Sequence, residues 1–237
     1  MMLQDHPAMG GMQGLRSRMI GIRSAAGTLF LVLVLAGIHA LVLVFGDPDR
    51  VFLRLGLSRG GLATGDYWQL LTYGLLHGNL IHLFVNLAGL LIIGSRVERI
   101  CGAAALAKIF WVGIVFGGLA QCFLAPAAQR GAPLVGASGG LAALVLWLTA
   151  MAPDARVWPL KISGRNLGRG ILLAEGGFLI GGWLFPDMAP VFVAHACHLG
   201  GGIAGWWMAH RLLGAPPSLA DLKRARARAE SGYGNKH

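Results

Sequence analysis

The sequence predicts an all-α membrane protein built as a six-transmembrane-helix bundle. Hydrophobic residues make up 55% of the 237 residues and charged residues only 13%, about half the charged fraction of an ordinary soluble domain. Several apolar runs approach the roughly 20 residues that a helix needs to cross a bilayer. The 37 glycines also fit this class, because small residues let membrane helices pack closely.

Charges and turn-forming residues separate the apolar runs and divide the chain into three parts. We expect a basic tail at 1–24, a six-span domain at 25–213 and a second basic tail at 214–237. The first apolar run is too long for the core of a signal peptide and precedes no small-residue cleavage site, so we expect it to be retained. The six spans are expected at 25–45, 75–95, 103–124, 134–151, 170–185 and 191–213.

The connection at 46–66 is the longest between predicted spans. It mixes arginines with large apolar residues, a composition that favours a segment lying partly in the membrane interface or against the bundle. We therefore do not expect it to be a plain solvated loop.

The placement of the basic residues predicts the orientation of the bundle. Six spans put both tails on one side, and that side carries 16 of the 20 lysines and arginines. By the positive-inside rule both termini are then cytoplasmic. The net charge of +10 therefore suits anionic lipid headgroups and not nucleic acid. We expect a multi-pass protein of a bacterial inner membrane, and the pattern favours no particular oligomeric state.

The three cysteines lie in or beside apolar runs and form no CxxC pair. They predict neither a disulfide framework nor a zinc site, and we expect no metal and no cofactor. We interpret Cys101, Cys122 and Cys197 as small buried apolar residues.

Polar side chains stand inside several predicted spans, where a charged group costs on the order of 2.5–3.5 kcal/mol to bury. His82 and Asn86 are four residues apart and share one face of the second span. His195 and His198, three apart, share a face of the sixth span. In the predicted topology the second, fourth and sixth spans all enter the membrane from the outer side. Their polar residues then lie at similar depth, namely His82, Ser138 and His198. These residues therefore predict one polar layer.

Glycines in the fourth and sixth spans predict a close contact between the two helices. Gly201 and Gly205 continue the face of His198 at helical spacing. Packing through these glycines would bring His198 to Ser138. The fourth span offers a matching set of small residues, namely Gly136, Gly139 and Gly140.

This polar layer permits acyl transfer. A serine hydroxyl becomes nucleophilic when a base takes its proton, and a neutral histidine is the usual base. The Asn86 amide, a His82 ring N–H and the backbone N–H of Ser138 are suitable donors to an oxyanion. No Asp or Glu stands where the pattern would orient His198, so we expect a Ser–His dyad and not a triad. Glu175, near the cytoplasmic end of the predicted fifth span, is interpreted as structural or interfacial.

Three motifs follow one another in the second, fourth and sixth spans. They are HxxxxHxxxN from His77 through His82 to Asn86, GxSG at 136–139, and HxxGxxxG from His198 to Gly205. Together they resemble the rhomboid family of intramembrane serine proteases, over about residues 26–213. Two further segments resemble that family: Glu98-Arg99 with Gly102, similar to its E-R-x-x-G segment, and Trp68-Gln69, with glutamine in place of its arginine.

The resemblance implies a six-helix core that cleaves transmembrane protein substrates, with the fifth span as the substrate gate. It implies Ser138 as the nucleophile and His198 as the base. It also implies that His82 and Asn86 stabilise the oxyanion. His195 competes for the role of base, but the spacing of the downstream glycines favours His198. The replacement of arginine by glutamine at position 69 would change how the first loop is anchored, and it would leave the catalytic chemistry unaffected.

Two other functions stand as alternatives. A membrane transporter or metal-binding protein would use the intramembrane histidines as ligands, although the sequence offers no acidic or cysteine partner set. Metal-dependent activity, or full function of His198→Ala, would favour it. A catalytically inactive rhomboid-like protein would bind membrane clients without cutting them; such relatives lose the serine or the histidine, and this chain keeps both.

The predicted glycine contact leads to a first test. We expect Gly139→Val to impair cleavage of a model transmembrane substrate, because the added side chain would separate Ser138 from His198 while leaving both in the chain. Unchanged cleavage would refute the packing argument and leave the assignment of the dyad intact.

Overall fold

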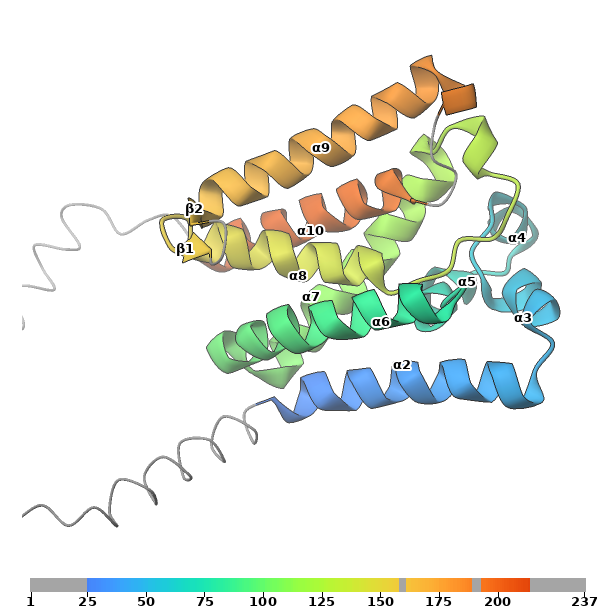
Figure 1. Ribbon diagram of the computed structural model, residues 1–237, viewed down its shortest axis with the longest axis horizontal. Helices are drawn as coiled ribbons and strands as arrows, with labels where there is room; N and C mark the ends of the chain where they lie inside the picture. Colours follow the sequence, from blue (N-terminus) through green and yellow to red (C-terminus); the bar gives the residue numbers. More distant parts are fainter. Residues whose placement is uncertain (1–24, 158–160, 189–192, 214–237) are drawn as a thin grey trace, which may run out of the picture.

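The computed structural model describes residues 25–157, 161–188 and 193–213, and it is mostly helical (Figure 1). The predicted tails at 1–24 and 214–237 lie outside the described residues. Two described helical runs, Ala26–Phe45 and Leu80–Leu124, are long and apolar enough to cross a membrane, and Ser138–Met151 is a shorter apolar helix. Large exposed apolar side chains, including Phe30, Phe84 and Phe178, give the bundle the kind of surface that contacts lipid.

The first span is α2 (Ala26–Phe45), within one residue of its predicted bounds. The connection that follows folds into two short helices, α3 (Pro48–Leu55) and α4 (Arg59–Thr64). Leu57 between them is 2% exposed and forms two backbone hydrogen bonds with Leu134. This connection therefore packs against the bundle, as its apolar residues predicted.

Gln69 anchors this first loop. It begins α5 (Gln69–Thr72) and is buried. Its Oε1 accepts the Ser58 N–H at 3.1 Å, and its Nε2 donates to the Arg54 carbonyl at 3.4 Å. Trp68 Nε1 donates to the same carbonyl at 3.2 Å. The glutamine, which departs from the motif that the chain resembles, thus still holds the loop to the bundle.

The predicted second and third spans form one helical run with a sharp break. After η1 (Tyr73–Leu75) come α6 (Leu80–Gly89), the π-helical turn η2 (Leu90–Gly94) and α7 (Ser95–Leu124). Gly102 interrupts α7 with φ +82° and ψ 165°, a conformation that side chains with a Cβ rarely adopt. The chain turns back there (Figure 1), where the sequence predicted a break.

Helix α6 begins later than predicted. Asn79 accepts the His82 N–H at 2.8 Å and caps the helix, so α6 starts at Leu80 and not at position 75. His77 therefore lies in the loop before the helix and not on it. It is buried there, with its ring edge-on to His82 at 5.2 Å between centroids.

The helix at the predicted fifth span also has different bounds. A two-stranded antiparallel hairpin, β1 (Arg156–Val157) and β2 (Ile162–Ser163), precedes it and departs from the all-α prediction. Ser163 accepts the Asn166 N–H and caps α9 (Gly164–Leu184), so the helix starts at Gly164 and not at position 170. The remaining elements are η3 (Ala127–Gln129), α8 (Ser138–Met151), η4 (Pro186–Met188) and α10 (His195–Leu213).

The most extensive interhelical contact joins α10 to α8, and the next joins α10 to α7. A Cβ atom at Gly201 would overlap the Gly139 carbonyl oxygen, and one at Gly205 would overlap the Ala143 carbonyl oxygen. The backbones of α8 and α10 therefore touch directly. Gly136 and Gly140 do not take part, contrary to prediction: they face His82 and Phe110.

Glu98 ties the start of α2 to α7. This buried carboxylate accepts hydrogen bonds from Gly27 N at 2.8 Å, Thr28 N at 2.7 Å and Thr28 Oγ1 at 2.7 Å. Two of these donors are orphan N–H groups at a helix N-terminus, where negative charge is also favourable. Glu98 therefore stabilises the packing of the first helix.

We expect Glu98→Gln to lower the melting temperature in detergent by a few degrees. The amide has one acceptor oxygen fewer and no charge, and an unpaired buried donor costs about 1–3 kcal/mol. Thermal unfolding followed by circular dichroism measures the effect, with the exposed Asp187→Asn as the matched control. Equal melting temperatures for the two variants would contradict the role of Glu98.

Candidate active site

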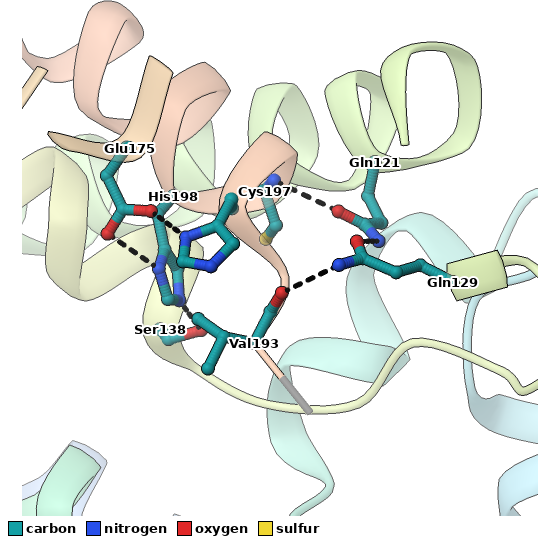
Figure 2. Close-up of polar contacts among 8 residues, drawn as sticks. Gln121, Gln129, Ser138, Glu175, Val193, Cys197 and His198 are labelled. Carbon is teal, nitrogen blue, oxygen red and sulfur yellow. Dashed lines mark hydrogen bonds and ion pairs between the residues drawn. The ribbon is translucent and has the colours of Figure 1, made fainter. Parts of the chain in front are cut away.

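Ser138 and His198 meet where α8 and α10 begin. Ser138 is the first residue of α8, and His198 lies in the first turn of α10. Ser138 Oγ is 2.9 Å from His198 Nε2 (Figure 2). An imidazole nitrogen at this distance can take the hydroxyl proton.

A polar chain from α7 holds the first turn of α10. The Cys197 N–H, which has no partner within its own helix, donates to Gln121 Oε1 at 3.2 Å. Gln121 also contacts Gln129, which donates to the Val193 carbonyl at 3.3 Å (Figure 2). Because Cys197 precedes His198, these contacts fix the position of the imidazole relative to α7.

Tyr73 holds the loop before Ser138. Its hydroxyl donates to the Ile114 carbonyl at 2.5 Å and lies 3.7 Å from Cys197 Sγ. Its own carbonyl accepts the Gly136 N–H at 2.9 Å. This fully buried side chain thus joins α7, α10 and the loop that leads into α8.

The structure brings the second-span residues to the same site. His82 lies against Gly136, which has φ +129° and where a Cβ would stand 2.6 Å from His82 Cε1. A side chain at position 136 would therefore displace the histidine. Both His82 and Asn86 line a cavity of about 680 Å³ together with Ser138 and His198.

Asn86 is oriented by its own helix. Its Nδ2 donates to the His82 carbonyl at 2.9 Å, and its Oδ1 has no hydrogen-bond partner among the described residues. One amide N–H is therefore engaged and the other is left for a bound group. The first N–H groups of α8 are further donors, because helix N-termini leave them unpaired and carry partial positive charge. Such donors suit a developing oxyanion.

Glu175 also belongs to this site, which corrects its interpretation as a structural or interfacial residue. Because α9 starts at Gly164, Glu175 lies near the middle of the helix. Its Oε1 is 3.1 Å from His198 Nδ1 (Figure 2). Its Oε2 is 2.6 Å from His195 Nδ1. The expectation that no carboxylate reaches His198 is therefore wrong.

Sequence reasoning missed this contact although a signal was present. An ionisable residue inside a membrane span calls for an internal partner, and Glu175 was the only carboxylate in the predicted fifth span. The role of Gln121 had no such signal, because a single glutamine in an apolar helix does not indicate which backbone N–H it meets.

Within the described part of the chain, Glu175, His195 and His198 form a group that could hold a metal ion. One ligand atom from each lies within 4.8 Å of the others. A bound zinc ion would stand about 2.0–2.2 Å from each ligand atom, so it would have to displace both hydrogen bonds of the carboxylate. The direct contacts therefore favour a hydrogen-bonded cluster.

Comparison with known proteins places this chain in a family. Residues 64–215 match the Rhomboid domain. A protein named rhomboid protease GlpG from Yersinia pestis (strain Pestoides F) is 29% identical over 192 residues, which cover 79% of this chain and 64% of that protein. Proteins of the same name match in Yersinia pseudotuberculosis serotype I (30% over 193 residues; 79% and 64%) and Photorhabdus laumondii (31% over 146 residues; 61% and 47%).

The chain spans 64% of the length of the first of these relatives. The matched segment, 64–215, is more than half of the chain and contains both members of the Ser138–His198 pair as well as His82, Asn86 and Glu175. The match to the Rhomboid domain and to these relatives confirms the resemblance that the three sequence motifs indicated. The chain belongs to the rhomboid family.

Proposed function

We propose that this protein is an intramembrane serine endopeptidase that cleaves transmembrane protein substrates through Ser138 and His198. The observation that carries the proposal is the 2.9 Å contact between Ser138 Oγ and His198 Nε2. The relatives named as rhomboid proteases support it, because the chain shares their family and has a serine and a histidine in contact.

The reaction follows from this geometry. As Ser138 Oγ attacks the carbonyl carbon of the scissile bond, its proton passes to His198 Nε2. The oxyanion is stabilised by the N–H groups at the start of α8 and by His82 and Asn86, which line the same cavity. The tetrahedral intermediate collapses, His198 gives the proton to the leaving amine, and an acyl ester remains on Ser138. Water activated by His198 then hydrolyses the ester and frees the serine.

Hydrolysis inside a membrane requires a supply of water. The cavity that holds Ser138 and His198 is also lined by Ser58, Gln129 and Arg130, which belong to the loops at the same end of the bundle. We expect these polar side chains to admit water from the aqueous phase to the serine.

The membrane arrangement is part of the proposal. The six spans are α2, the helical segments that precede and follow the break at Gly102, α8, α9 and α10. The positive-inside bias supports cytoplasmic termini, with the basic tails against anionic headgroups and no role in nucleic-acid binding. The bacterial origin of the relatives supports an inner-membrane location.

We expect Ser138→Ala and His198→Ala to abolish cleavage of a single-span substrate in liposomes, by about a thousandfold or more. Each variant removes one partner of the proton transfer. Ser95→Ala and His210→Ala are matched controls, because these side chains bond their own helix backbones away from the site, and both should cleave as the wild type does.

Cleavage that survives Ser138→Ala would exclude the proposed mechanism. A wild-type protein that captures the substrate without cutting it would instead identify an inactive, client-binding member of the family.

A further inference from the structure

The proposed dyad gives no task to Glu175, the charged group nearest to it. This side chain is 21% exposed, and its two oxygens meet the Nδ1 atoms of two histidines. A carboxylate in a membrane span is costly unless it is paired. The arrangement indicates that both histidines donate to it.

The contact determines the tautomer of His198. An ionised carboxylate can only accept hydrogen bonds, so the Nδ1 atom that faces Glu175 carries the proton. A neutral imidazole has a single N–H, and Nε2 is therefore unprotonated where it faces Ser138 Oγ. That is the form able to take the serine proton, whereas the other tautomer is not.

We propose that Glu175 is a positioning residue that extends the pair to a Ser138–His198–Glu175 triad. The inference rests on the proposed function. When His198 takes the proton of Ser138 it becomes an imidazolium, while Glu175 stays ionised and accepts the Nδ1–H throughout. The positive charge thus forms 3.1 Å from a carboxylate oxygen, in surroundings where such a charge pair is stronger than in water.

His195 holds the carboxylate in place. Its Nδ1 bonds the second oxygen at 2.6 Å, its side chain is 8% exposed, and its ring stacks on Phe178 of α9 at 4.9 Å between centroids. With one oxygen fixed by His195, the other faces His198. The competition between the two histidines for the role of base is therefore resolved by geometry: His198 contacts the serine and His195 orients the acid.

The triad joins three helices, and one of them, α9, buries few of its residues. The buried positions of α9 among the described residues are Gly164, Gly168 and Gly182. Few large side chains therefore hold α9 against α8 and α10, and the alignment of His198 depends on where α9 lies. A displacement of α9 would move the Glu175 carboxylate away from His198. Nothing would then hold the imidazole proton on Nδ1, and His198 would no longer be fixed in the tautomer that can accept the serine proton.

The kinetic test compares Glu175→Gln with Glu98→Gln, the same change at a buried carboxylate remote from the serine. We expect Glu175→Gln to lower kcat by about 10- to 1,000-fold and to change KM less than about twofold, because the amide no longer dictates the tautomer or stabilises the imidazolium. Glu98→Gln should lower the melting temperature and leave kcat per folded molecule unchanged. A kcat for Glu175→Gln equal to that of Glu98→Gln would overturn the triad.

A second measurement does not use the Glu175→Gln variant. Nitrogen-15 NMR of histidine-labelled wild-type protein should show His198, identified by the signal missing from His198→Ala, with Nδ1 protonated and Nε2 unprotonated. The opposite tautomer would overturn the inference. Failure of the triad leaves Ser138-dependent cleavage intact, whereas failure of the proposed function removes that cleavage itself, so the two results are distinguishable.

Discussion

The direct backbone contact between α8 and α10 is the constraint on which the site depends. Gly201 lies on the Gly139 carbonyl and Gly205 on the Ala143 carbonyl, with no room for a side chain at either glycine. Membrane helices gain little from burying apolar surface against one another, so close packing of small residues drives their association. Because Ser138 precedes Gly139 and His198 lies one turn before Gly201, this contact brings the hydroxyl and the imidazole within hydrogen-bond distance.

The remaining polar groups of the site are held by contacts between distant parts of the chain. Tyr73 bonds the Ile114 carbonyl and the Gly136 N–H, and Gln121 bonds the Cys197 N–H. Each of these contacts gives a hydrogen-bond partner to a polar group buried away from water, where an unpaired one is costly. These hydrogen bonds therefore hold the loop before Ser138 and the first turn of α10 in place inside an apolar bundle.

Periodicity in the sequence was enough to predict much of this arrangement. The spacing of His198, Gly201 and Gly205 put the base and the packing surface on one helix face, and the turn at Gly102 was visible as a glycine between charged and apolar runs. Such patterns describe faces within a helix. They do not describe how a loop turns, which is why the contact of Gly136 with His82 was not predicted.

The misplaced helix ends had a different physical cause. Hydrophobicity marks the part of a helix that lies in lipid, whereas capping marks where the helix begins. Ser163 starts α9 within the polar, basic stretch between the predicted fourth and fifth spans, and Asn79 starts α6 beyond His77. The first difference moved Glu175 from the predicted end of a span to the middle of a helix and so concealed its contact with His198.

The central claim is that the α8–α10 contact activates Ser138 through His198. Covalent labelling with a serine-directed fluorophosphonate, followed by mass spectrometry of the modified peptide, tests this directly and needs no knowledge of the physiological substrate. We expect modification of Ser138 alone, and loss of that modification in folded His198→Ala protein. Labelling of a different serine, or equal labelling of Ser138 without His198, would contradict it.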